Sequence, residues 1–330
     1  MRIVIDAMGG DKAPQCNVDG AVMAVKELGY EVTLVGDEKA VTGLLSAQDY
    51  PKDKIKVVNA SQAIGMEEPA ALSVRRKRDS SIVKAVDLLK SDGHDAFVSA
   101  GNTGAVVCAG TLSLRLLEGV DRPGIAVIIP TLDKPCMVID VGANIDPKPL
   151  HLLQYGIMGD AYSKHILGKK EPTIGLLNIG EESTKGTDFV KECHTMLSDS
   201  RLNFIGNIEP KQVYQGAADV VVCDGFVGNV FLKVTEGVAD AASQLVKREL
   251  KNSNFITKLG AALTLPAFRK IKRKLDATEY GGAPLLGIDG RVIICHGSSN
   301  AKAIKNAIKV AGEYVDHHVN MHIIEELQSF

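Results

Sequence analysis

The amino-acid sequence predicts a three-layer α/β/α fold around a mostly parallel β-sheet. Short runs of β-branched residues alternate along the chain with segments whose apolar residues recur at helical spacing. Most of these runs are apolar almost throughout, which is typical of strands covered by helices on both faces. No low-complexity linker, fixed-period repeat or break in composition divides the chain. We therefore expect a single two-lobed unit over residues 1–330.

The first part of the chain alternates strand and helix patterns. β-Branched runs predict strands at 2–6 (RIVID), 31–36 (EVTLVG), 55–58 (IKVV) and 96–100 (AFVSA). Apolar residues at three- and four-residue spacing predict helices over 17–28, in a short segment before 55, over 81–90 and over 103–117.

The remainder continues in the same way. We expect strands at 124–130 (GIAVIIP), 136–140 (CMVID), 173–178 (TIGLLN), 203–208 (NFIGNI), 219–224 (DVVVCD) and 291–296 (RVIICH). The helical pattern returns over 149–167, 187–197, 227–250 and 301–318.

Composition excludes several functional classes. The formal net charge is −2 and tryptophan is absent, so the chain has neither the positive field nor the aromatic surface that nucleic-acid binding uses. The 6 cysteines contain no C-x-x-C pair, which favours buried thiols in a reducing compartment over a disulfide framework or a zinc site. The start, MRIVIDAMGG, lacks the apolar stretch of a signal peptide. We expect a cytoplasmic protein that binds no nucleic acid and no metal.

One segment, residues 255–275 (FITKLGAALTLPAFRKIKRKL), combines apolar residues with many basic ones and no acidic one. Helical spacing on both sides of Pro266 predicts two short helices that meet at a bend, a protruding amphipathic basic hairpin. It is too charged to span a bilayer. It suits an anionic lipid surface, an acidic protein partner or a solvated outer face. The candidate docking residues are Leu259, Leu263, Leu265, Phe268, Arg269, Lys270, Ile271, Lys272, Arg273 and Lys274.

Glycine-rich loops follow five of the predicted strands. They are VSAGNTGA (98–105), VIDVGAN (138–144), LLNIGEESTKGT (176–187), VVCDGFVGN (221–229) and IICHGSSN (293–300). In a parallel sheet we expect such loops to meet at the carboxyl ends of the strands, where ligands of open α/β sheets bind. Glycine lets the backbone approach a ligand, and helix N-termini favour anions. The loops therefore predict a phosphate or carboxylate site.

The common cofactor and nucleophile signatures are absent. DAMGGDKAP lacks the G-x-G-x-x-G spacing, and no loop reads G-x-x-x-x-G-K-[ST], so neither a dinucleotide nor a Walker-type ATP site is supported. G-x-S-x-G is also missing, and nothing marks a covalent nucleophile.

Single candidate residues each have an ordinary interpretation. Asn102 and Thr103 suit the N-cap of the following helix as well as a ligand contact. Lys185 is either a solvated loop lysine or a cation placed against phosphate. His296 is either a strand-end histidine or a proton carrier at the site. Asp224 ends a strand, where capping is common.

Taken together, the loops resemble a known family. DAMGGD, SAGNTGA, DVGAN, LLNIGEE with the following KG, CDGFVGNVFLK, YGGAPLLG and HGSS are similar, in order and across nearly the whole chain, to the bacterial fatty acyl-ACP:phosphate acyltransferase (PlsX) family.

The resemblance implies reversible transfer of a long acyl chain from acyl carrier protein to inorganic phosphate, without a cofactor. It implies a fold like that of isocitrate and isopropylmalate dehydrogenases and of phosphotransacetylases. It also implies a homodimer bound peripherally to the inner face of the cell membrane, where a membrane glycerol-3-phosphate acyltransferase consumes the acyl phosphate for phospholipid synthesis. The hairpin would then meet anionic lipid, the acidic carrier protein, or both.

Phosphate is already an anionic nucleophile, so the protein mainly has to hold it against the thioester and stabilise the oxyanion. We assign Lys185 to that charge, and Asn229 and His296 to orienting or proton-handling roles. The expected phosphate- or substrate-binding residues are Gly101, Asn102, Thr103, Gly104, Gly142, Asn144, Asp224 and Ser298.

Three other functions compete with this one. The same fold and loops suit a phosphotransacetylase-like enzyme that uses acyl-CoA, which donor competition would reveal. A non-catalytic acyl-phosphate or lipid-binding module would show no turnover. A metal-dependent decarboxylating dehydrogenase would need an acidic metal cluster and a nucleotide site, and the sequence presents neither.

Overall fold

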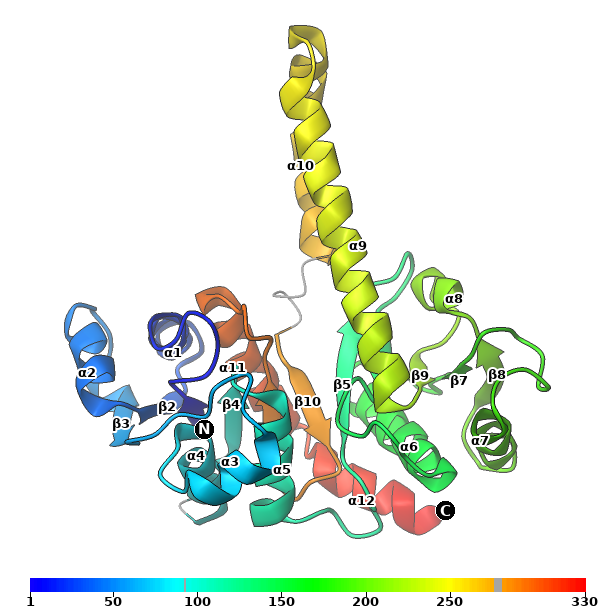
Figure 1. Ribbon diagram of the computed structural model, residues 1–330, viewed down its shortest axis with the longest axis horizontal. Helices are drawn as coiled ribbons and strands as arrows, with labels where there is room; N and C mark the ends of the chain where they lie inside the picture. Colours follow the sequence, from blue (N-terminus) through cyan, green and yellow to red (C-terminus); the bar gives the residue numbers. More distant parts are fainter. Residues whose placement is uncertain (92, 276–280) are drawn as a thin grey trace.

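The computed structural model describes residues 1–91, 93–275 and 281–330; for residues 265, 268, 269 and 271–275 it describes the backbone alone (Figure 1). The elements up to the middle of the chain are β1 (Arg2–Asp6), α1 (Gln15–Leu28), β2 (Glu31–Gly36), α2 (Glu38–Ser46), the 3-10 turn η1 (Lys52–Lys54), β3 (Ile55–Asn59), α3 (Ala70–Arg76), α4 (Ser81–Ser91), β4 (Ala96–Ser99), α5 (Thr103–Leu114), β5 (Gly124–Ile129), β6 (Cys136–Ile139) and α6 (Pro149–His165). They are followed by β7 (Ile174–Leu177), α7 (Asp188–Ser198), β8 (Phe204–Ile208), α8 (Pro210–Gln215), β9 (Val220–Val222), α9 (Gly225–Asn252), α10 (Phe255–Leu275), β10 (Ala283–Leu286), β11 (Val292–Ile294), α11 (Ala301–Asp316) and α12 (Val319–Ser329).

The strands of the described residues form a single 11-stranded sheet in the order β3-β2-β1-β4-β11-β10-β5-β6-β9-β7-β8. Neighbours are parallel from β3 to β11 and again from β6 to β8. In between, β10 is antiparallel to β11 and β5, and β5 is antiparallel to β6. The sheet is mostly parallel, as predicted, but its two halves point in opposite directions.

Helices cover both faces of this sheet, which confirms the three-layer prediction. Successive side chains along each strand point to opposite faces of the sheet, so the core is divided between the two faces. Val4, for example, faces one side, while Ile3 and Ile5 face the other. One continuous core lies beneath α3, α4, α5, α8 and the start of α9. On the opposite face, α1, α2 and α11 cover one half of the sheet, and α6, α7 and α12 cover the other.

Strand β10 was not predicted, and it connects the two halves. Ala283 and Pro284 pair with β11, whereas Leu285 and Leu286 pair with β5. The segment is short, contains a proline and follows two glycines, so the local sequence is typical of a loop.

The hairpin is built differently from the prediction. Residues 255–275 form one helix, α10, with Pro266 inside it, so the expected division into two short helices at Pro266 is wrong. Proline has a helical φ but removes one backbone hydrogen bond, and the helical backbone nevertheless continues past it. The turn lies instead at Ser253 and Asn254, where the Asn254 side chain accepts from the N–H of Thr257 at 2.9 Å. The hairpin therefore consists of α9 and α10, and its outer part projects from the body (Figure 1).

Among the described residues, none of the helices combines the length and hydropathy that crossing a bilayer requires.

Candidate active site

The glycine-rich loops form two groups, not one. Because the halves of the sheet run in opposite directions, the carboxyl ends of β1, β4 and β11 face away from those of β6, β9 and β7. The expectation that all five loops share one edge is therefore wrong. We call the loops after β1, β4 and β11 (7–14, 100–102 and 295–300) the first loop group, and those after β6, β7 and β9 (140–148, 178–187 and 223–224) the second loop group.

The first loop group is packed backbone against backbone. A methyl group added to Gly9 would lie 2.4 Å from Asp6 Oδ2 and 2.5 Å from the amide nitrogen of Gly101. Gly10 has a φ of +96°, and its Cβ would lie 2.9 Å from the carbonyl oxygen of Gly297. The N–H of Asp11 donates to that same carbonyl at 2.8 Å. Only glycine permits this approach, so the loops after β1, β4 and β11 form a single unit.

A buried carboxyl group supports this unit from below. Asp6 accepts from the N–H of Met8 at 3.0 Å and from Ser99 Oγ at 2.8 Å. Burial raises the pKa of the Asp6 carboxyl, while hydrogen bonds from Ser81, Ser99 and the backbone oppose that rise. Its role is to hold the loop after β1 against the loop after β4.

The side chain of Asn102 is used entirely within the protein. Its Oδ1 caps α5 by accepting from the N–H of Ala105 at 3.0 Å, and its Nδ2 lies within 3.1 Å of the carbonyls of Gly65, Met66 and Glu68. The capping interpretation is thus confirmed. Thr103 and Gly104 are exposed, and within the described part of the chain their amide N–H groups have no hydrogen-bond acceptor. The first turn of α5 therefore offers free donors that suit an anion.

In the second loop group, by contrast, the corresponding donors are occupied. Buried Asp140 accepts from the N–H groups of Ile125, Gly142, Ala143 and Asn144 at 2.7–3.0 Å. Burial raises the pKa of the Asp140 carboxyl, and these hydrogen bonds oppose the rise. The Asn144 side chain also points inward, where its Nδ2 donates to the carbonyl of Pro123 and to Tyr155 Oη.

The amide donors at the start of α9 are already hydrogen bonded within the protein. Asp224 Oδ1 accepts from the N–H groups of Phe226 and Val227, and the N–H of Gly225 donates to the carbonyl of Asn144. Asn229, one turn further on, is exposed, and its side chain lies 3.6 Å from the position a Cβ would take on Gly142. Asn229 is thus available to a ligand, whereas Asp224 holds the helix end.

Lys185 lies in the loop between β7 and α7. Its backbone is fixed by Asn178, whose Nδ2 donates to the Lys185 carbonyl at 3.1 Å. The Lys185 side chain is 50% exposed, and its Nζ is 4.0 Å from Glu182 Oε1, a weak surface pair. It is available to an anion, but neither Asn229 nor His296 is hydrogen bonded to it.

His296 and Ser298 lie together, with a partner that the sequence analysis missed. His296 Nδ1 is 2.7 Å from Ser298 Oγ, and His296 Nε2 is 3.2 Å from Nζ of Lys233 on α9. Lys233 forms an ion pair with Glu236 at 2.9 Å. Lys233 ends the motif CDGFVGNVFLK and lies four residues after Asn229. That helical spacing on one face was the signal that could have identified it.

The apolar tip of the hairpin is exposed. Leu259 and Leu263 are 55% and 78% exposed, and the nearby Phe255 and Ile256 are each 79% exposed. Lys270 is also exposed. The side chains of Leu265, Phe268, Arg269, Ile271, Lys272, Arg273 and Lys274 lie outside the described residues.

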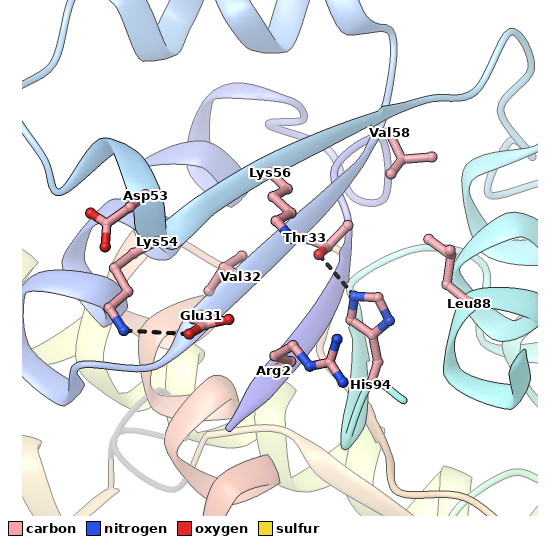
Figure 2. A pocket seen from close by; sticks show the side chains of 10 residues that line it. All are labelled: Arg2, Glu31, Val32, Thr33, Asp53, Lys54, Lys56, Val58, Leu88 and His94. Carbon is pink, nitrogen blue, oxygen red and sulfur yellow. Dashed lines mark hydrogen bonds and ion pairs between the residues drawn. The ribbon is translucent and has the colours of Figure 1, made fainter. Parts of the chain in front are cut away.

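Two small cavities lie away from both loop groups. The one shown in Figure 2 has a volume of about 80 Å³ and is lined by Arg2, Glu31, Val32, Thr33, Asp53, Lys54, Lys56, Val58, Leu88 and His94. Thr33 Oγ1 is 2.9 Å from His94 Nε2 across it. A second cavity, of about 290 Å³, lies between the ends of α4 and α5 and the start of β11. Both adjoin the amino ends of β1, β2 and β11, opposite the first loop group, so we give them no part in the chemistry.

Comparison with known proteins identifies the family. A family model described as "Fatty acid synthesis protein" matches residues 1–322. The phosphate acyltransferase of Geotalea daltonii is 49% identical over 328 residues, which cover 99% of this chain and 94% of the relative. The phosphate acyltransferase of Geobacter sulfurreducens is 46% identical over 329 residues, covering 100% and 95%.

Solved structures confirm the fold class. A phosphotransacetylase from Streptococcus pyogenes superposes with a TM-score of 0.64 at 18% identity, covering 96% of this chain and 94% of that one. A 4-hydroxythreonine-4-phosphate dehydrogenase from Klebsiella pneumoniae gives a TM-score of 0.55 at 14% identity, covering 97% and 99%. These likenesses concern the fold alone. The match of the family model and the full-length identity to curated relatives show that the chain belongs to the fatty acid synthesis protein family, together with the phosphate acyltransferases.

Proposed function

We infer that this protein is an acyltransferase that moves a fatty acyl group from the thioester of acyl carrier protein to inorganic phosphate and so forms an acyl phosphate. The observation that carries the inference is the near-complete coverage of both chains in the match to curated phosphate acyltransferases. The loops support it, because the first turn of α5 offers free amide donors and Lys185, Asn229 and Lys233 present polar groups to solvent.

The reaction needs few protein groups. An oxygen of phosphate attacks the thioester carbonyl carbon, the electron pair of the C=O bond moves to oxygen, and a tetrahedral oxyanion forms. Collapse of this intermediate breaks the C–S bond, and the carrier leaves as a thiolate that takes up a proton. Holding the two reactants together and stabilising the oxyanion supply most of the rate enhancement in such reactions.

The proposed roles follow from which groups are free. Lys185 neutralises phosphate or the oxyanion, and the turn Gly101–Gly104 receives phosphate through the amides of Thr103 and Gly104. Asn229 and His296 orient the reactants or handle protons, with Ser298 beside the imidazole. Asn102, Asn144 and Asp224 act by holding loops and helix ends, because their side chains are already hydrogen bonded within the protein. Gly142, which has no side chain, leaves space for the side chain of Asn229.

Purified protein should be mixed with palmitoyl-ACP, with and without inorganic phosphate. We expect the free carrier thiol and a hydroxamate-trapped acyl phosphate to appear together, and only when phosphate is present. If palmitoyl-CoA reacted and palmitoyl-ACP did not, the carrier would be the wrong donor. If neither reacted, a non-catalytic binding module would replace the enzyme.

The hairpin is proposed to bind the membrane surface, on the cytoplasmic face, where a glycerol-3-phosphate acyltransferase would use the product. Its support is the exposed apolar tip with basic residues beside it, since each cation near an anionic surface contributes about 1 kcal/mol. Liposome flotation of Leu259→Glu/Leu263→Glu tests the idea. Lost flotation with intact acyl transfer supports lipid binding; retained flotation rejects it, and lost transfer without lipid points to carrier docking.

We also propose a homodimer. Val230, Val234 and Val238 form an exposed apolar stripe along α9, at 48%, 57% and 63% exposure, which a second copy would cover. Light scattering after size-exclusion chromatography should give twice the chain mass of 35.2 kDa. A mass of one chain at micromolar concentration would reject the dimer.

A further inference from the structure

Lys233 connects the long helix α9 to the first loop group. Its ammonium lies 3.2 Å from His296 Nε2 in the loop after β11, and 2.9 Å from Glu236 Oε2 one turn further along α9. Glu236 Oε2 is itself 3.9 Å from His296 Nε2. Two side chains from different elements thus hold one cation in place, whereas a surface lysine is normally left to sample many rotamers.

The hydrogen bonds around His296 indicate what the imidazole does. An ammonium can only donate, so a hydrogen bond from Lys233 requires Nε2 to be the acceptor nitrogen. The other ring nitrogen, Nδ1, faces Ser298, whose Oγ lies 2.7 Å away and whose backbone nitrogen lies 3.2 Å away. In this arrangement both nitrogens of His296 are engaged within the protein, so the ring is suited to orienting Lys233.

A chain of contacts connects Lys233, through the histidine loop, to the start of α5. Gly297, next to His296, would place a Cβ 3.0 Å from Met66 Cε, and the carbonyl of Met66 accepts from Asn102 Nδ2 at 3.0 Å. The loop that carries Met66 therefore joins the histidine loop to the start of α5. Lys233 is 53% exposed at this junction, so an anion can reach its ammonium.

We propose that Lys233 is a catalytic residue whose ammonium contacts the attacking phosphate at the first loop group, and that His296 and Glu236 position it. The proposal rests on the proposed acyl transfer to phosphate and adds to Lys185 a second cation, carried by α9. Two cations suit a reactant that carries between one and two negative charges at neutral pH. Each charge-assisted contact also strengthens as the site is desolvated by the acyl chain.

The test compares Lys233→Met, Lys233→Gln and Lys233→Arg with Lys309→Met. Lys309 is a matched control, since it forms an exposed helical ion pair with Glu313 at 3.3 Å on α11. In the palmitoyl-ACP assay we expect Lys233→Met and Lys233→Gln to lower kcat/KM for phosphate by about tenfold to a hundredfold, without changing KM for the carrier substrate. Lys233→Arg should recover part of the loss. Unchanged kcat/KM for phosphate in both uncharged variants would overturn the proposal.

The positioning role is tested by a double-mutant cycle. If His296 acts through Lys233, His296→Ala lowers kcat/KM for phosphate in the wild-type background and has little further effect beside Lys233→Met. Fully additive losses would show that His296 acts independently and would overturn that part.

Binding is also measured without any donor. Phosphate that binds the folded protein raises its Tm by mass action. We expect inorganic phosphate to raise the Tm of the wild type and of Lys309→Met, and to have a much smaller effect on Lys233→Met. If this pattern holds but no acyl donor reacts, the proposed function fails while the Lys233 contact stands. If the Tm responses of all variants are equal, the contact is wrong even when the enzyme is active.

Discussion

Replacing Gly228 by alanine should uncouple α9 from the second loop group. A Cβ on Gly228 would lie 1.9 Å from the carbonyl oxygen of Asp140 and 2.8 Å from Cys223 Sγ. Non-bonded carbon and oxygen atoms approach to about 3.3 Å, so α9 or the Asp140 backbone has to move by roughly 1.4 Å. Asp140 is buried and accepts four backbone N–H bonds, so it resists that movement.

Two opposing contributions determine how far Gly228→Ala changes the free energy of unfolding. Alanine is favoured over glycine inside a helix by about 1 kcal/mol. Overpacking a well-filled site costs about 1–3 kcal/mol, and a contact with backbone belongs at the upper end. We therefore expect Gly228→Ala to lower the free energy of unfolding by about 2 kcal/mol. The same shift displaces Asn229 and Lys233, and a misplacement of about 1 Å can cost on the order of a hundredfold in rate.

Gly237→Ala is the matched control on the same helix. A Cβ at Gly237 meets no atom of the described chain within 4 Å, so only the helix-propensity gain remains. Urea unfolding should show Gly237→Ala to be more stable than the wild type by up to about 1 kcal/mol, with unchanged acyl transfer. If Gly228→Ala were as stable and as active as Gly237→Ala, the close packing of α9 on Asp140 would be refuted.

Three further predictions concern single side chains. Lys185→Met should lower kcat/KM for phosphate by about tenfold or more, because an exposed cation at the site is lost; unchanged phosphate saturation would remove Lys185 from the site. In urea unfolding, Asn102→Ala should lower the free energy of unfolding by about 2 kcal/mol. Thr187→Ala, which removes a cap with a single hydrogen bond, should lower it by about 0.5–1 kcal/mol. Equal losses would contradict the role of Asn102 in holding two loops together. Hydrogen bonds from Lys77, from the N–H of Gly65 and from Ser73 lower the pKa of Glu68 from 4.5 to about 2, and the bond from Lys77 contributes most. The ionised form of Glu68 therefore stabilises the fold fully above about pH 4.5, and this contribution is lost as the pH falls toward 2. The Tm difference between wild type and Glu68→Gln should shrink over that range, and a difference independent of pH would refute the ion pair.

Much of the fold could be predicted because each element carries its own local signal. The strands from RIVID to RVIICH are short apolar runs, and caps such as Asn102 and Asp224 stand where their helices begin. Strand β10 carries no such signal. Pro284 lacks an N–H for the ladder, and the strand exists because β11 and β5 hold it from either side. The direction of the sheet reverses at the antiparallel pair β5–β6, and β10 joins that pair to the first half. The way in which the two halves join could therefore not be predicted from local periodicity.

The candidate site likewise contains some residues that the sequence indicated and others whose roles depend on tertiary packing. The order of the motifs indicated Lys185, Asn229 and His296, and the helical spacing of Lys233 from Asn229 was also readable. The inward direction of the Asn144 side chain could not be predicted, because its hydrogen-bond partners, Pro123 and Tyr155, are distant in sequence. Likewise, Asp140 accepts from the amides of the DVGAN motif that were expected to face a ligand. Only the packed structure shows which of the two loop groups keeps its donors free.

Helix α9 explains how two loop groups on opposite edges of a sheet can serve one reaction. Its first turn is fixed to Asp140 and Asn144, where Gly225 and Gly228 leave no room for a side chain. From Asp224 to Lys233 the helix rises about 14 Å at 1.5 Å per residue, which carries Lys233 to His296. Beyond that point the same helix continues into the exposed hairpin (Figure 1). Because a helix packed at one end is stiff, the placement of the cation depends on glycine packing two turns away, and the hairpin and the site share one rigid support.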